Sequence, residues 1–213
     1  MANGGAIKVW DPLVRIFHWA LVIAFFTAYA TGEDVHEVHE WMGYTVLGLV
    51  VFRIVWGFVG QAHARFADFL RGPAEILRNF RDVVLMHPKR YLGHSPAGGA
   101  MVIALLALLA ATTATGIIAE EQLEQAGPQP GVSTPSGERG AQGKAAEHDD
   151  SPIAEAHEVL ANLTLALVLL HIAGVILASF AHRENLVASM FSGRKRVTSL
   201  RWDHASIGQY TIR

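Results

Sequence analysis

Long apolar runs alternate with polar connections along the whole chain. The runs are 13–30, 41–60, 99–118 and 153–181. A helix that crosses the hydrocarbon core of a bilayer needs about 20 apolar residues, and each run is close to or above that length. The short alternating segments of a membrane β-barrel are absent. We therefore expect an all-α, polytopic membrane protein in which residues 1–213 form a single four-helix domain.

The connections between these runs differ in composition. Residues 61–96 are polar and basic, but apolar side chains recur in them at helical spacing, which predicts an amphipathic helix on the membrane surface. Residues 119–152 are rich in Gly, Pro, Gln, Ser and acids, which predicts a flexible loop without a core of its own. The short connection 31–40 holds acids and no Lys or Arg.

The segregation of charge predicts the topology. Of the 17 Lys and Arg residues, only Arg139 and Lys144 fall in the connections 31–40 and 119–152. By the positive-inside rule these two connections face the periplasm, while both termini and 61–96 face the cytoplasm. We expect a multi-pass protein of the bacterial inner membrane. Ala28-Tyr29-Ala30 has the form of a signal-peptidase site, but three more spans follow, and we interpret the first run as an uncleaved anchor.

Composition restricts the chemistry. The chain is 51% hydrophobic with a mean hydropathy of +0.28, too apolar for an ordinary soluble domain. It has no cysteine, which excludes disulfides, thiolate metal sites, iron–sulfur clusters and covalently attached c-type haem. It has 11 histidines. A metal or cofactor would therefore depend mainly on imidazole ligands.

Four of these histidines lie in or beside the apolar runs at two depths. His157 and His171 are fourteen residues apart, so they share one helix face at heights about 21 Å apart. His39 lies at the periplasmic depth of His157, and His18 at the cytoplasmic depth of His171. Intramembrane imidazoles are costly and mark function, and each pair suits bis-histidine ligation from different helices. We expect two non-covalent b-type haems stacked through the membrane.

Other residues near these layers have more open roles. Arg15 and Arg53 lie near the cytoplasmic boundary and are candidates to pair with haem propionates. Gly43 and Gly48 would leave room for a macrocycle. His36 forms a His-x-x-His pair with His39, which suits either a surface metal pair or a solvated residue near a propionate. His94, before the third run, suits either an interfacial helix start or a place beside a quinone.

Several motifs together resemble the bacterial cytochrome b561 family, which includes the b-type subunits of nickel–iron hydrogenases. They are VWDPLVRIFHW at 9–19, HEWMGY at 39–44, RIVWG at 53–57, YLGHSPAGG at 91–99, HE at 157–158, HIAG at 171–174, ENL at 184–186 and GRK at 193–195. The resemblance implies a four-helix bundle with two b haems, the inner one ligated by His18 and His171 and the outer one by His39 and His157. It also implies electron exchange between a quinone pool and an outside redox partner, or with superoxide.

We therefore expect a di-haem cytochrome that relays electrons between the quinone pool and a periplasmic partner such as a c-type cytochrome or a hydrogenase. Its partners would be membrane lipid, quinone and that redox protein, and no nucleic acid. Whether the protein is itself an enzyme stays open, because a superoxide:quinone oxidoreductase is the alternative, although a positive funnel for an anion is lacking. Alternatives of other classes are a histidine-based metal-binding membrane protein and a haem-free anchor subunit.

Overall fold

The computed structural model of the chain describes residues 6–8, 12–60, 65–85, 95–126, 151–182 and 185–196. These ranges form seven helices and two short strands. In chain order they are β1 (Ala6–Lys8), α1 (Pro12–Thr31), α2 (His36–Val59), α3 (Phe66–Phe69), α4 (Pro73–Val84), α5 (Pro96–Ala126), α6 (Pro152–His182), α7 (Leu186–Ser192) and β2 (Arg194–Arg196). The predicted all-α class is confirmed.

Helices α1, α2, α5 and α6 are long and apolar enough to cross a bilayer, with mean hydropathies of 1.7, 1.8, 2.3 and 2.4 in their most apolar windows. Large apolar side chains cover their outer faces: Ile23 is 66% exposed, and Phe58 and Phe180 are each 71% exposed. A surface of this kind would cause the protein to aggregate in water, but in a bilayer it contacts the hydrocarbon chains of the lipids. The predicted four-span membrane protein is therefore confirmed.

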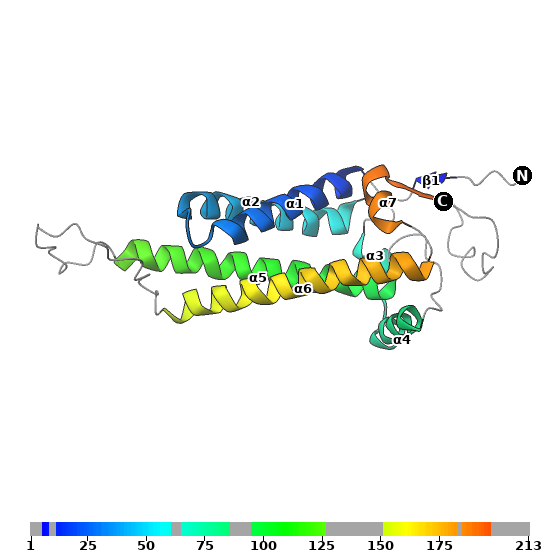
Figure 1. The fold of residues 1–213 in the computed structure, drawn as a ribbon. Coiled ribbons are helices and arrows are strands. Elements are labelled where there is room, and N and C mark those ends of the chain that lie inside the picture. The colour runs from blue at the N-terminus through cyan, green and yellow to red at the C-terminus, as the bar shows by residue number, and fades with distance from the viewer. Residues whose placement is uncertain are drawn as a thin grey trace, which may run out of the picture.

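The four long helices are arranged as two antiparallel hairpins (Figure 1). In the first hairpin α1 packs on α2, in the second α5 packs on α6, and the two hairpins meet mainly where α2 contacts α5. Helices α3, α4 and α7 and the antiparallel β1–β2 pair lie together at one end of the bundle. We call this the basic end, because it carries Arg65, Arg71, Arg78 and Arg81. The other is the acidic end, with Glu33, Asp34, Glu37, Glu120, Glu121 and Glu124.

The structure differs from the sequence prediction in three elements. Helix α5 continues to Ala126, so residues 119–126 are helical where a loop was predicted. The Glu, Gln, Leu and Ala residues in this stretch are strong helix formers. The charged glutamates therefore mark the membrane boundary rather than the end of the helix. The predicted amphipathic segment is two helices, α3 and α4, separated before Pro73. The β1–β2 pair was not predicted.

Helix α4 is fixed against the start of α5 by a buried side chain. Asn79 is 4% exposed, and its Oδ1 accepts a hydrogen bond of 3.3 Å from the backbone N–H of Ala97. Ser95 Oγ accepts a second bond, of 3.2 Å, from the N–H of Gly98. The first N–H groups of a helix have no partner within the helix, so these two side chains satisfy donors that hydrocarbon cannot. The Asn79 bond thereby holds α4 beside the beginning of α5, and the Ser95 bond caps α5 itself.

A hydroxyl pair joins α5 to α6 at mid-height in the bundle. The Oγ1 atoms of Thr112 and Thr164 lie 3.2 Å apart, and Thr164 is completely buried. Each hydroxyl also bonds to the backbone carbonyl four residues earlier in its own helix. Small hydroxyl side chains of this kind let helices approach closely while every polar atom keeps a partner. The pair therefore fixes the register of α5 against α6.

A glycine in α2 accommodates a buried aromatic ring from α3. The Phe66 ring lies directly against Gly57, where a methyl group would overlap it. The same ring faces Arg53, whose guanidinium carbon is 5.0 Å from the ring centroid, which is a cation–π distance. The absence of a side chain at Gly57 thus keeps Phe66 in contact with a cation that is only 2% exposed.

Replacement of Gly57 by alanine is expected to destabilise the protein, because the added methyl group displaces the Phe66 ring from α2. Overpacking of this kind costs about 1–3 kcal/mol. The matched control is Gly48→Ala in the same helix, where no atom lies within 4 Å of the added methyl group. Thermal unfolding in detergent should place the midpoint of Gly57→Ala several degrees below the parent and that of Gly48→Ala at or slightly above it. Equal midpoints for the two variants would contradict this account.

Candidate functional site

One face of α2 points into the bundle along its whole length. Val46, Val50, Arg53 and Gly57 recur at intervals of three or four residues and are all buried. His39 continues this row toward the acidic end, with Gly43 between it and Val46. Gly48 does not belong to it: nine residues from His39, it lies on the opposite, exposed face of α2. The prediction that Gly48 makes room for a macrocycle is therefore wrong.

His39 from α2 and His157 from α6 meet near the acidic end of the bundle. Their ring centroids are 5.9 Å apart, and the ring planes are nearly perpendicular at 88°. They come from helices separated by more than 90 residues of sequence that belong to different hairpins. The structure thus brings together the two histidines that were predicted to form the outer layer.

Backbone carbonyls determine which ring nitrogen each of these histidines presents. His39 Nδ1 lies 2.8 Å from the carbonyl oxygen of Ala28, and His157 Nδ1 lies 2.8 Å from that of Thr112. Because a carbonyl can only accept a hydrogen bond, each Nδ1 is the protonated nitrogen and donates. Each Nε2 then carries the free lone pair. This is the arrangement in which imidazoles bind metals, because the bond at one nitrogen fixes the tautomer and the ring orientation.

Two glycines make these hydrogen bonds possible. A methyl group at Gly116 of α5 would lie 2.9 Å from Cε1 of His157, closer than carbon atoms pack. A methyl group at Gly32, just after α1, would lie 3.3 Å from Nδ1 of His39. Each imidazole therefore lies directly against a backbone that lacks a side chain. Sequence reasoning missed Gly116 because it lies on α5, far in sequence from His157. It missed Gly32 because nothing in the turn between α1 and α2 pairs this glycine with His39 before the chain is folded.

His18 of α1 and His171 of α6 form the second pair, toward the basic end. The two imidazoles lie close enough to interact electrostatically, and both are largely withdrawn from the surface. His18 Nδ1 is buried without a hydrogen-bond partner among the described residues. The adjacent Trp19 packs edge-on to the His18 ring at a centroid distance of 5.3 Å. The two residues of the predicted inner pair thus lie within electrostatic range of each other, and among the described residues neither has a backbone hydrogen bond of the kind that orients the outer pair.

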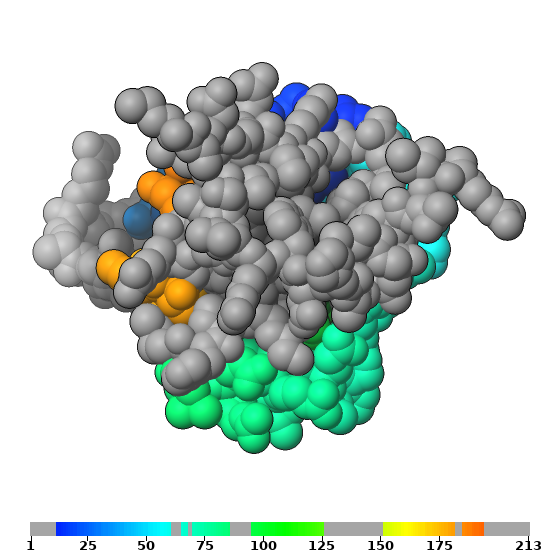
Figure 2. Space-filling view, turned by 90° about the vertical axis from the view of Figure 1, so that its right-hand side faces the viewer, coloured from blue at the N-terminus to red at the C-terminus, as the bar shows by residue number. Residues whose placement is uncertain are grey.

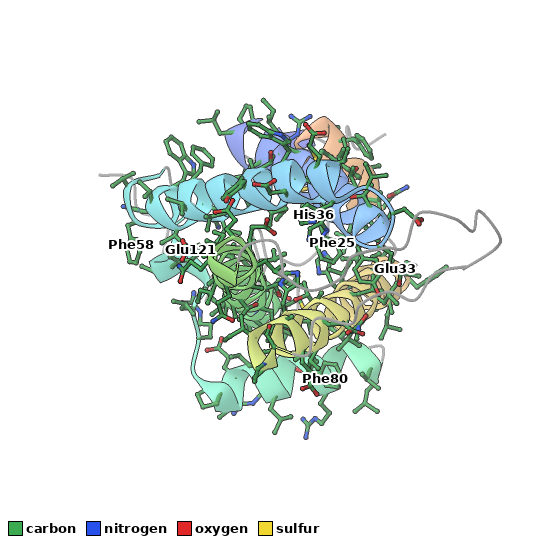
Figure 3. All side chains as sticks on the ribbon, turned by 90° about the vertical axis from the view of Figure 1, so that its left-hand side faces the viewer. Phe25, Glu33, His36, Phe58, Phe80 and Glu121 are labelled. Carbon is green, nitrogen blue, oxygen red and sulfur yellow. The ribbon has the colours of Figure 1, made fainter. Side chains whose placement is uncertain are left out.

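Buried side chains, most of them apolar, lie between the two layers. Phe25 is 8% exposed, Val46 is 3% exposed and Thr164 is fully buried. Figure 3, which looks along the bundle from the acidic end, places Phe25 in the interior between the helices. Because these side chains exclude water, the two histidine layers are separated by a dry region.

Helix α7 covers the inner layer at the basic end. Arg15 Nε donates a hydrogen bond of 3.0 Å to the Met190 carbonyl, and Phe191 stacks on Trp19 at a centroid distance of 4.2 Å. Gly193 ends α7 with a φ of +72°, and a methyl group there would lie 2.8 Å from Arg15 Nη1. One nitrogen of Arg15 therefore orders the C-terminal segment, a contact that sequence reasoning did not anticipate when it assigned Arg15 to a propionate.

His36 does not join these layers. His36 is exposed, and its Nε2 lies 3.3 Å from a carboxylate oxygen of Glu120, while His39 turns inward. A His36–His39 metal pair is therefore not formed. Within the described ranges no group of three or more His, Asp or Glu side chains converges as a metal-binding cluster would. His94, whose role was left open, lies outside the described residues, as do His63, His87, His148 and His204.

Residues 9–193, nearly the whole chain, match the family model described as prokaryotic cytochrome b561. The chain belongs to the prokaryotic cytochrome b561 family. No curated protein and no solved structure matches it. Membership makes this protein a membrane-bound b-type cytochrome, so its work is electron transfer and its cofactor is b-type haem. The family resemblance stated from the motifs is confirmed.

The outer histidine pair of this cytochrome b561 fits a haem iron. Metal–imidazole bonds of about 2 Å on each side of one ion separate the two ring centroids by about 6 Å, and the observed separation is 5.9 Å. Gly43, one turn from His39 on the inner face of α2, has no atom within 4 Å of the place where a side chain would begin. The free Nε2 atoms and the open space at Gly43 are what a bis-histidine haem site requires.

Buried hydrogen-bond donors without a described partner lie on α1 and α2 toward the basic end, in the same half of the bundle as His18 and His171. Arg53 is 2% exposed, yet among the described residues its Nη1 has no hydrogen-bond partner, and neither has the indole N–H of Trp19 or Trp56. A buried cation that meets no carboxylate among the described residues is unfavourable, and the cation–π contact with Phe66 offsets only part of that cost. All three groups donate hydrogen bonds, so the missing partner is an acceptor, and a haem propionate is an acceptor of the right charge.

Replacement of Gly116 by valine is expected to lower the haem content of the purified cytochrome, because the larger side chain pushes the His157 ring off the Thr112 carbonyl. The matched control is Ala114→Val, at an exposed position two residues earlier in α5. The haem-to-protein ratio should fall clearly for Gly116→Val and stay at the parental value for Ala114→Val. A normal ratio in Gly116→Val would mean that the backbone hydrogen bond is not needed to hold His157.

Proposed function

We propose that this cytochrome b561 is a di-haem electron relay, with His39 and His157 ligating an outer haem and His18 and His171 an inner haem. The observation that carries the proposal is the His39–His157 pair, because both rings are held by backbone carbonyls with their Nε2 atoms free. The His18–His171 pair supports a second site about 21 Å further along the bundle, by the helical rise between His157 and His171.

The residues of the chain have distinct tasks in this proposal. The four imidazoles bind iron, and the carbonyls of Ala28 and Thr112 hold two of them in one tautomer. Arg53 offsets the negative charge of a propionate, and the buried side chains between the layers exclude water and protons. Haem supplies reversible one-electron chemistry when bound, and the protein adjusts it through axial ligands, hydrogen bonds and burial. Arg15 keeps donors beyond its Nε for a second propionate contact.

The two ends of the bundle suit different partners. The positive-inside rule assigns the basic end to the cytoplasm and the acidic end to the periplasm. A quinone, which is membrane-soluble, would exchange electrons with the inner haem. The outer haem lies below the acidic end, whose carboxylates would steer a basic periplasmic redox protein such as a c-type cytochrome. A hydrogenase is the other candidate partner in the same position.

Absorbance spectra of the oxidised and dithionite-reduced protein, with haem quantified per chain, test the proposed pairing. The parent should hold two b haems per chain. His157→Ala should lose mainly the outer haem and His171→Ala mainly the inner one, so each variant should retain about half of the haem with a different reduced spectrum. His36→Ala is the matched control, because this exposed histidine lies beside His39 in sequence but faces Glu120. One haem per chain, or identical losses in both variants, would overturn the pairing.

Neutralising the acidic end tests the proposed partner class. Replacing Glu33, Asp34 and Glu37 by their amides should slow electron exchange with a basic c-type cytochrome several-fold at low salt and should weaken its salt dependence, since electrostatic steering is screened by salt. Stopped-flow measurements of haem reduction at two ionic strengths give both quantities. Glu75→Gln, at the basic end, is the control and should leave both unchanged. Rapid haem reduction by superoxide, with no other protein present, would favour the oxidoreductase alternative instead.

A further inference from the structure

An apolar groove lies between α4 and the beginning of α5. It has a volume of about 390 Å³. Pro73, Ile76, Leu77 and Phe80 line it from α4, Ala97, Ala100, Met101 and Ala104 from α5, and Leu167 from α6. Figure 2, which views the basic end, shows α4 projecting at the lower edge of the molecule, as Figure 1 does from the side. The groove thus lies under a helix that stands apart from the four-helix bundle.

The lining residues restrict the chemistry of the occupant. All nine side chains are apolar, so the part of a ligand inside the groove must be hydrocarbon, because a polar group there would lose its hydrogen bonds. The groove starts at Ala97, the second residue of α5, and extends to Ala104, a rise of about 10 Å. It therefore starts at the membrane boundary and descends into the hydrocarbon layer. A chain that hangs from a headgroup at the interface has this shape.

The residues at the rim of the groove indicate which kind of headgroup it would bind. Leu77 and Phe80 are 70% and 57% exposed on the groove face of α4. Arg81 lies four residues after Leu77, one turn further along α4, and so borders that face. Its side chain is 70% exposed, and its contact to Asp82 is long at 3.7 Å. An exposed pair of this length contributes little, so this guanidinium remains available to an anion at the level where phosphates lie.

We propose that this groove is a binding site for an anionic phospholipid. One acyl chain fills the space between α4 and α5, and the phosphate lies beside Arg81. The lipid then completes the packing of α4, which the chain itself fixes mainly through Asn79 and Ala97. The site is independent of the haem assignment, since none of its lining residues is one of the four histidines or of the donors near them.

The test measures lipid retained by the full-length cytochrome. Purified protein is delipidated and then offered phosphatidylglycerol or phosphatidylcholine, and native mass spectrometry counts the molecules that remain bound. The parent should retain one phosphatidylglycerol molecule in preference to phosphatidylcholine. Ala100→Leu and Ala104→Leu fill the groove and should abolish this retention, whereas Ala114→Leu, at an exposed position in the outer half of α5, should preserve it. Arg81→Gln should lower the preference for phosphatidylglycerol about fivefold, and Arg78→Gln, on the far side of α4, should not.

A second measurement keeps the proposal falsifiable if a variant fails to fold. A photoactivatable phosphatidylglycerol analogue, added to the parent protein, should crosslink to peptides from α4 and the first turns of α5. Retention that is equal for both lipids, or crosslinks spread evenly over the four spans, would overturn the proposal. A quinone that displaces the crosslink at stoichiometric concentration would assign the groove to a quinone tail. A dimer in solution that Ala104→Leu disrupts would assign it to a second copy of the chain.

Discussion

The rest of the structure depends on how imidazole rings are held inside an apolar interior. A histidine there must form a hydrogen bond at one ring nitrogen and keep the other nitrogen free to bind a metal. His39 and His157 meet this requirement by donating from Nδ1 to carbonyls of Ala28 and Thr112, which lie on α1 and α5. A helix carbonyl keeps accepting capacity beyond its own intrahelical bond. The geometry of the outer pair is therefore set by how α1 packs on α2 and α5 on α6.

Holding these rings in place requires small residues where the neighbouring elements make contact. Gly32 and Gly116 leave the space that the two rings occupy, and Gly57 leaves space for Phe66. Inside a helix glycine is about 1 kcal/mol less favourable than alanine, so the presence of Gly57 and Gly116 within α2 and α5 reflects close approach between elements. Thr112 combines both tasks, since its carbonyl orients His157 and its hydroxyl joins α5 to α6. Ligand position and helix register thus depend on the same few residues.

Sequence patterns predicted the features that depend on hydropathy along the chain or on distance from the membrane boundary. The spans follow from hydropathy, and the two histidine layers follow from counting helical rise from the membrane boundary. The assignment of Gly48 failed because depth was used without the helix face, since nine residues from His39 is half a turn away. The extension of α5 failed because polar residues were taken to end the helix. Contacts such as Arg15 with Met190, or His157 with Gly116, join distant segments and have no local signal.

The two histidine layers differ in a way that only the three-dimensional structure reveals. In the outer layer Nδ1 of His39 and Nδ1 of His157 each have a backbone carbonyl as hydrogen-bond acceptor. In the inner layer His18 Nδ1, Arg53 Nη1 and two indole N–H groups have none among the described residues. Four unsatisfied polar groups would cost several kcal/mol in a folded chain, since each costs about 1–3 kcal/mol or more. They lie in the half of the bundle toward the basic end, on α1 and α2 alone. Among the described residues no carboxylate meets this buried arginine or the two indoles, so these donors suit an acceptor supplied by a bound cofactor.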